Sequence, residues 1–260
     1  MLDYNQEAER YDASRGGEPR AEAAADGVLG LVPPHARSLL DLACGTGIVT
    51  RRLAAARDGL RVTGVDLTDE MVRRAAARLP GAILRADARR LPFPDGRFDA
   101  VVSVWLLHLL SDPADVRAVV GECARVLRPG GVYVTTVDKA AAHNVGSDID
   151  AVLASRPRTR AADAPAAVAA YAAAHGLLPA GEVRFPGRGQ GRSPRRTIAD
   201  LHRGWFVTLP PGDPRAGAFA ERLAALPDQD RPRPDPWFTL RAFRKPARPA
   251  LPEQRHTAAT

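Results

Sequence analysis

The residues of this 260-residue chain with the clearest chemical potential lie at a glycine-rich turn and at an acidic side chain that follows it. The turn is the segment Asp41-Leu42-Ala43-Cys44-Gly45-Thr46-Gly47, which connects a short apolar run to a stretch with helical spacing. Glycines in such a turn let a ligand approach the backbone closely, and the amides that open the helix point toward it. Asp66 follows Gly47 by 19 positions, where a carboxylate accepts hydrogen bonds from both hydroxyls of a ribose.

The turn departs from the pattern that binds dinucleotides. Thr50 stands where the sequence Gly-x-Gly-x-x-Gly would have its third glycine. Two glycines preceded by an acid are poorly suited to a pyrophosphate. The pattern therefore predicts a ligand that has a ribose and no phosphate.

Two histidines are candidate catalytic bases. His108 follows the fourth predicted strand and His143 follows the fifth, at the edge where open parallel sheets bind ligands. Imidazole titrates near neutral pH and can accept a proton from a hydroxyl or ammonium group, whereas a carboxylate acceptor needs no base. The alternative for His108 is a hydrogen bond to a backbone carbonyl in the core.

The residue pattern does not support a metal site or a catalytic nucleophile. Cys44 and Cys123 match no metal-ligand spacing, and two cysteines form no disulfide framework, which fits a reducing cytoplasm. Cys44 suits a small apolar position in a tight turn. The sequence contains no Gly-x-Ser-x-Gly elbow and no apolar run of ~18–20 residues. Its first seven residues are polar and acidic, unlike a secretory signal.

The elements that position these residues alternate between strand and helix. Apolar runs predict strands, and apolar residues at helical spacing predict the helices between them. Continuous apolar runs indicate a parallel sheet covered on both faces, with right-handed crossovers. The predicted strands are 38–42, 61–66, 82–86, 98–104 and 132–137, and the predicted helices are 48–57, 69–79 and 114–127.

The second half of the chain is less regular. Alanine-rich residues 141–176 favour helix, 182–185 a sixth strand, 197–208 and 215–226 helices, and 237–243 a last strand. We expect one domain over 1–245, with an N-terminal helical lid (1–34), a core (35–140), a helical cap that shapes the substrate region (141–235) and a final strand (236–245). Residues 246–260 are rich in proline and polar groups, which predicts a disordered tail.

The motifs together resemble the class I S-adenosylmethionine-dependent methyltransferases, in the subgroup with the ubiquinone-biosynthesis type of domain. They follow the family's order and spacing over about residues 35–140. The resemblance implies a Rossmann-like, doubly wound α/β fold with a seven-stranded, mostly parallel sheet whose last strand is antiparallel. The matching segments are Asp41–Gly47, Gly64–Asp66, Ala86–Ala88, Leu91–Phe93, Phe98–Val101, His108 and Arg125–Gly131.

The resemblance also implies roles for single residues. Gly45 and Gly47 flank the methionine and ribose of S-adenosylmethionine, Asp41 lies near its ammonium group, and Asp66 holds the ribose. Asp87 and the amide of Ala88 meet the adenine. Arg15 pairs with the methionine carboxylate. The other expected cofactor contacts are Tyr11, Ala43, Cys44, Leu67, Met71 and, near the sulfonium, Trp105 with Leu106.

The expected function is methyl transfer to a small molecule or short peptide, such as a specialised metabolite, at oxygen or nitrogen rather than carbon. No Asn-Pro-Pro-Tyr-type segment follows the fourth strand, which argues against planar base or amide nitrogens as acceptors. The formal charge of +7 favours an alternative RNA or protein substrate, but only Lys139 and Lys245 among 37 basic residues are lysines, as in a GC-rich genome. A third alternative is a catalytically silent partner subunit that binds the cofactor. The oligomeric state, monomer or homodimer, stays open.

Overall fold

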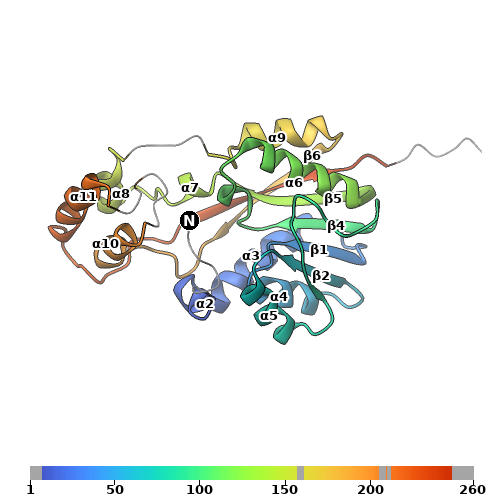
Figure 1. Cartoon of the computed structure of the whole chain (residues 1–260), viewed down its shortest axis with the longest axis horizontal. Coiled ribbons are helices and arrows are strands. Elements are labelled where there is room, and N and C mark those ends of the chain that lie inside the picture. Colours follow the sequence, from blue (N-terminus) through green and yellow to red (C-terminus); the bar gives the residue numbers. More distant parts are fainter. Residues whose placement is uncertain (1–7, 157–160, 205–208, 210–211, 248–260) are drawn as a thin grey trace, which may run out of the picture.

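The computed structural model describes residues 8–156, 161–204, 209 and 212–247. Within these residues, one seven-stranded sheet has the order β3-β2-β1-β4-β5-β7-β6 (Figure 1). β7 runs antiparallel to both of its neighbours, whereas the other adjacent strands are parallel, as predicted. The strands are β1 (Ser38–Leu42), β2 (Arg61–Asp66), β3 (Ile83–Arg85), β4 (Phe98–Ser103), β5 (Leu127–Val137), β6 (Leu178–Pro186) and β7 (Trp237–Arg244).

Helices cover both faces of this sheet (Figure 1). α6 (Pro113–Val126) and α9 (Pro165–Ala174) lie on one face, and α3 (Gly17–Leu31), α4 (Ile48–Ala55) and α5 (Asp69–Arg78) lie on the other. Every residue of β1 is buried, which explains why its run of apolar residues is continuous rather than alternating. The shorter elements are α2 (Tyr11–Ser14), η1 (Leu107–Leu109) and α7 (Lys139–Ala142).

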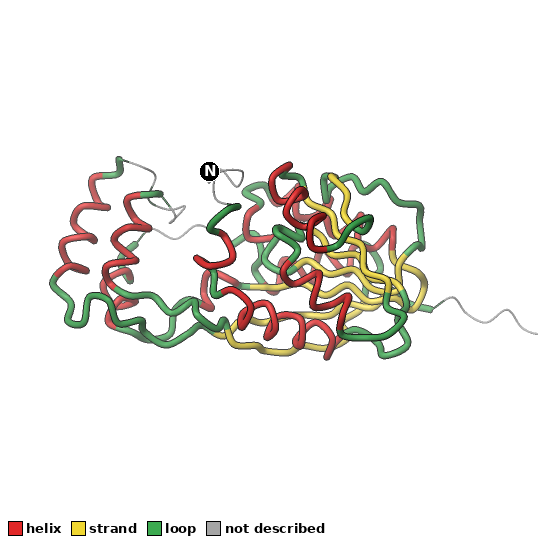
Figure 2. Tube along the Cα trace, turned by 90° about the horizontal axis from the view of Figure 1, so that it is seen from below, coloured by secondary structure: helices red, strands yellow, loops and turns green. Residues whose placement is uncertain are grey.

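A helical cap lies beyond the end of the sheet (Figure 2). It consists of α8 (Asp148–Leu153), α10 (Pro194–His202) and α11 (Pro214–Ala224). These helices bury an apolar cluster of their own, separate from the two clusters on the faces of the sheet. The cap is continuous with α7, which follows β5 directly, so it stands next to the carboxyl ends of the central strands.

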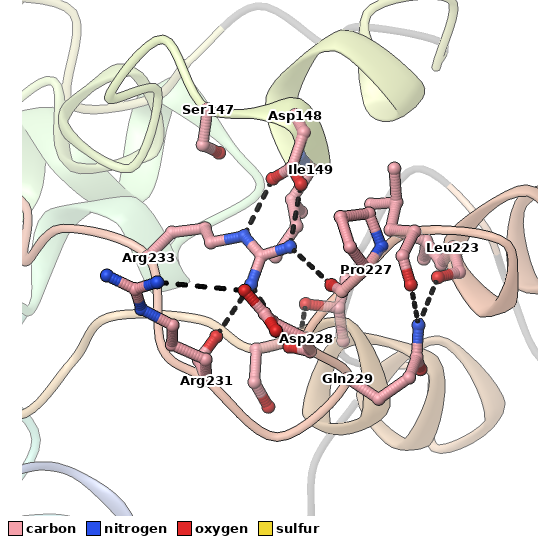
Figure 3. A network of polar contacts seen from close by, with 12 residues as sticks. Ser147, Asp148, Ile149, Leu223, Pro227, Asp228, Gln229, Arg231 and Arg233 are labelled. Atoms are coloured by element: carbon pink, nitrogen blue, oxygen red, sulfur yellow. Dashed lines mark hydrogen bonds and ion pairs between the residues drawn. The ribbon is translucent and has the colours of Figure 1, made fainter.

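One arginine joins the cap to the loop that leads back to β7. Arg233, whose side chain is 12% exposed, donates two hydrogen bonds to the carboxylate of Asp148, of 2.7 and 2.6 Å (Figure 3). Its guanidinium also donates to the carbonyl groups of Pro227, Asp228 and Arg231. The guanidinium thus has five acceptors, and its contact with Asp148 is bidentate. Together these hydrogen bonds fix the loop to the start of α8.

The predicted elements agree with the structure except at a few ends. β5 starts at Leu127 rather than at 132, with a register shift against β4 between Phe98 and Ala100. β6 runs over nine residues rather than four and belongs to the sheet, although it falls within the region expected to form the cap. Serine caps α10 at Ser193, so this helix begins earlier than predicted. Residues 205–208 and 248–260, which include most of the predicted tail, lie outside the described residues. The proposed division into domains stays a prediction.

Candidate active site

A cavity of about 390 Å³ opens at the carboxyl ends of β1, β2 and β4. It lies where the order of an open parallel sheet reverses, the usual ligand position in such folds. Most residues predicted to contact the cofactor line it, whereas Arg15, Gly47, His108 and His143 do not. The predicted residues on its wall are Tyr11, Asp41, Ala43, Cys44, Gly45, Asp66, Leu67, Met71, Asp87, Ala88 and Trp105.

Three strands end in a residue with left-handed backbone. Ala43 after β1 has a φ of 52°, Trp105 after β4 a φ of 62°, and Asp138 after β5 a φ of 52°. Residues other than glycine rarely adopt these angles, and such strain collects at functional sites. Its presence at three neighbouring strand ends marks this edge of the sheet as the functional one.

Two backbone amides orient the carboxylate of Asp66. The amide of Gly45 donates to Oδ2 at 2.8 Å, and the amide of Thr68 donates to Oδ1 at 2.9 Å. Asp66 is 8% exposed and lines the cavity. Each carboxylate oxygen accepts more than one hydrogen bond, so Asp66 is held in place with acceptor capacity left for a diol.

The two glycines of the turn have different structural roles. A Cβ at Gly45, where φ is +56°, would meet no atom within 4 Å, so the space beside this residue is open to a ligand. A Cβ at Gly47 would lie 2.9 Å from the Cα and Cβ of Ala75 in α5. Gly45 therefore leaves room for the ligand, while Gly47 lets α5 pack against the turn.

Asp41 is a buried acid at the base of the cavity. It is 3% exposed, and Thr50 Oγ1 donates to its Oδ2 at 2.7 Å. Burial raises the pKa of the Asp41 carboxyl to about 7, partly offset by the Thr50 hydrogen bond. A positive group beside Asp41 would favour its charged form. Burial also raises the pKa of the Cys44 thiol, so Cys44 is a packing residue rather than a nucleophile.

Asp87 also lines the cavity. Its carboxylate accepts from the Arg89 backbone amide at 2.9 Å and from the Arg89 guanidinium at 2.7 Å. These Arg89 hydrogen bonds hold the pKa of Asp87 below its usual range. Arg89 also bonds Asp115, another residue of the wall. Asp87 is therefore charged and fixed where the resemblance places the adenine.

The N-terminal segment is tied to the glycine-rich turn. Asp12 accepts a hydrogen bond from Thr46 Oγ1 and forms an ion pair with Arg78, both at 2.6 Å. Arg78 also donates to the carbonyl of Thr46 at 2.7 Å. These contacts hold α2, and with it Tyr11, over the cavity.

Arg20 is a cavity residue that the sequence analysis missed. Its guanidinium lies 3.7 Å from the centre of the Trp105 ring and donates to the carbonyl of Arg15 at 3.0 Å. Among the described residues, Arg20 Nε and Trp105 Nε1 are buried donors with no hydrogen-bond partner. Both residues line the cavity, so a bound anionic group is the natural acceptor. Arg20 thus takes the place expected for Arg15 at the cavity wall.

His108 pairs with a lysine that the sequence analysis also missed. Lys139 Nζ lies 3.0 Å from His108 Nε2. Burial, reinforced by Arg15 and Arg20, lowers the pKa of Lys139 to about 7, and burial with Lys139 lowers the pKa of His108 well below 6.5. His108 Nδ1 is buried and meets no partner within the described part of the chain. The role of His108 as a base stays a prediction, with one ring nitrogen taken by Lys139.

His143 lies further from the cavity. Its ring packs edge-on against Phe238 with the ring centres 5.4 Å apart. Burial and the charge of Arg192 lower the pKa of His143 well below 6.5. Its catalytic role also stays a prediction. The described residues hold no group of three or more His, Cys, Asp or Glu side chains placed to bind a metal ion.

Comparison with known proteins agrees with this geometry. Residues 40–135 match the family model described as a methyltransferase domain. The chain is 40% identical over 114 residues to 27-O-demethylrifamycin SV methyltransferase from Amycolatopsis mediterranei, which is 41% of this chain and 40% of that protein. It is 42% identical over 103 residues to demethylmenaquinone methyltransferase from Thermus thermophilus, which is 38% of this chain and 46% of that protein. The chain thus spans less than half the length of these relatives.

Solved structures share the fold over nearly the whole chain. A chain of the complex between the Haloferax volcanii Trm112 methyltransferase activator and a methyltransferase superposes with a TM-score of 0.59 at 22% identity, covering 95% of this chain and 99% of that one. The [4+2]-cyclase SpnF superposes with a TM-score of 0.58 at 19% identity, covering 94% of this chain and 95% of that one. At these identities the likeness concerns the fold alone.

Residues 40–135 resemble a methyltransferase domain of class I, of the ubiquinone-biosynthesis type. Such domains use S-adenosylmethionine as methyl donor, and the cavity is lined by the acid Asp66, the open glycine Gly45 and the buried arginine Arg20. In the part of the chain that the structure describes, no helix is both long and apolar enough to cross a bilayer.

Proposed function

We propose that this protein transfers the methyl group of S-adenosylmethionine to oxygen or nitrogen of a small molecule or short peptide, in the cytoplasm and within specialised metabolism. The observation that carries the proposal is the cavity, where Asp66, Gly45 and Arg20 meet at strained strand ends. The name of one relative, 27-O-demethylrifamycin SV methyltransferase, specifies an oxygen atom, which supports a heteroatom as the methyl acceptor.

The chain's own residues position the reactants and exclude water. When bound, the cofactor supplies an electrophilic methyl group on a sulfonium. Asp66 fixes the ribose, Arg20 and Asp41 hold the two charged ends of the methionine part, and Tyr11 covers the site. Alignment of this kind can contribute about 7–11 kcal/mol toward the barrier of a bimolecular transfer.

We expect the protein to bind S-adenosylhomocysteine and not NAD. The turn lacks the third glycine, and the space beside Gly45 is bounded by the acid Asp41 rather than by a cradle for a pyrophosphate. Isothermal calorimetry with the two ligands checks this expectation. Tighter binding of NAD would overturn the proposed function. Release of S-adenosylhomocysteine from S-adenosylmethionine with a small-molecule extract then separates an active enzyme from a silent subunit.

Asp66→Ala is expected to weaken binding of S-adenosylhomocysteine by about 1–3 kcal/mol, which is roughly 5- to 150-fold. The change removes the acceptor for the ribose and frees the amides of Gly45 and Thr68 that the carboxylate orients. Asp69→Ala is the matched control, because Asp69 carries the same charge nearby but is 69% exposed and pairs with Arg85. Calorimetry on both variants gives the comparison. Equal affinities in the two variants would show that the ribose lies elsewhere.

A further inference from the structure

Thr50 occupies the position that distinguishes the glycine-rich turn from one that binds a dinucleotide. In the dinucleotide fingerprint this residue is a glycine, which lets the helix pack closely on the strand. Thr50 lies in the first turn of α4 and is 0% exposed, so its side chain is enclosed by the fold. Its hydroxyl donates to Oδ2 of Asp41 in β1 at 2.7 Å. The difference in sequence therefore gives the acid at the base of the cavity a hydrogen-bond donor.

Asp41 has a single hydrogen-bond donor among the described residues, which is the Thr50 hydroxyl. Its carboxyl group is 3% exposed and lines the cavity. The titratable groups that face it are Asp66, at the end of the neighbouring strand β2, and Cys44 in the turn. Asp66 is a like charge, and neither group supplies a counter-charge. Burial raises the pKa of Asp41 to about 7, and the Thr50 hydrogen bond acts against this rise.

No cation of the described part of the chain is paired with Asp41. The buried guanidinium of Arg20, which lines the same cavity, faces Tyr11 and Asp12 instead. A buried acid without a counter-charge is costly to ionise unless a positive group of a ligand joins it. Oδ1 of Asp41 accepts no hydrogen bond from a described residue, so it is free to accept one from a ligand. The ammonium group of the cofactor's methionine part would bring the missing charge.

We propose that Thr50 is a positioning residue for the cofactor: its hydroxyl orients the Asp41 carboxylate and stabilises its charged form for the ammonium group of the methionine part. The inference rests on the proposed function, which places that ammonium group beside Asp41. Without the hydroxyl, Asp41 would have no donor from the described residues. Its neutral form, which cannot pair with an ammonium group, would then be favoured.

The test compares two ligands by calorimetry on the full chain at pH 7. One is S-adenosylhomocysteine, and the other is its desamino analogue, in which hydrogen replaces the α-amino group. Thr50→Val keeps the branched shape of the side chain and removes the donor. It should weaken binding of S-adenosylhomocysteine by about tenfold or more, as expected for a lost hydrogen bond to a charged group. The desamino analogue should bind the wild type and Thr50→Val equally.

Two further variants separate the hydroxyl group from the packing around it. Thr50→Ser retains the donor and loses a methyl group, so it should bind S-adenosylhomocysteine nearly as the wild type does. Thr197→Val makes the same substitution at another threonine that is 0% exposed, in α10 of the cap, where Oγ1 donates to the carbonyl of Ser193. This control should bind both ligands as the wild type does.

The pH profile is a readout that a purely structural role of Thr50 would not change. Asp41 has a pKa of about 7 in the free protein, so below pH 7 binding of an ammonium group must be accompanied by release of a proton. The affinity of the wild type for S-adenosylhomocysteine should therefore decrease by up to about tenfold per unit as pH falls from 7 to 5.5. In Thr50→Val the decrease should begin at a higher pH. The desamino analogue cancels the titration of other groups, such as Lys139, and should show neither effect.

The proposal fails if Thr50→Val binds S-adenosylhomocysteine as tightly as the wild type, if it loses affinity for both ligands equally, or if Thr50→Ser is as weak as Thr50→Val. Should Thr50→Val not fold, the wild type still decides, because equal pH profiles for the two ligands would refute the link to Asp41. Failure of the proposed function is distinguishable from these results, because the wild type would then not bind S-adenosylhomocysteine at all.

Discussion

His108→Ala is expected to lower kcat by ~10²–10⁴-fold while the affinity for S-adenosylhomocysteine stays normal, as loss of a general base would. Burial and the charge of Lys139, whose Nζ lies 3.0 Å from His108 Nε2, hold the pKa of His108 well below 6.5, so the ring is neutral at pH 7 and can accept a proton. The measurements are kcat, S-adenosylhomocysteine affinity and melting temperature of this one variant. A small loss of turnover with a lower melting temperature would show that His108 is structural.

The parts of the site that could be predicted from the sequence depend on local features. The turn that contains Gly45 and the acid Asp66 follow buried strands whose apolar runs are continuous, so strand, turn and acid are visible within 30 residues. Because the strands are parallel, the turn and Asp66 then lie at the same edge of the sheet. The same reasoning could not assign Arg20, because its segment is an ordinary alanine-rich helix. Its cation–π contact with Trp105 joins residues far apart in the chain.

The rarity of lysine in the sequence marks Lys139 as an unusual position. This chain uses arginine almost everywhere, and its two lysines both occupy half-buried positions. Lys245 Nζ donates to the carbonyl groups of Ala124 and Leu127 at 2.7 and 2.8 Å, where a compact ammonium group fits. Lys139 Nζ meets His108 in the same way. A lysine that persists against a strong arginine bias therefore marks a position where the shape of the cation matters.

The burial of Lys139 should destabilise the folded protein. We expect Lys139→Met to raise the free energy of unfolding at pH 7 by about 2–4 kcal/mol, because the pKa of Lys139 is lowered from 10.5 to about 7 on folding. Between pH 7 and 10.5 the unfolded chain holds a proton that the folded chain has lost. Wild-type stability should therefore gain up to about 1.4 kcal/mol per pH unit from this group across that window.

Urea unfolding of both proteins at pH 7.0, 7.5, 8.0 and 8.5 measures the difference, in which groups common to both cancel. The gap between Lys139→Met and the wild type should be largest at pH 7 and narrow steadily as pH rises. Arg222→Met, with the same change in net charge at an exposed position, should match the wild type throughout. A Lys139→Met protein that is less stable than the wild type, or a gap independent of pH, would show that Lys139 is already compensated in the fold.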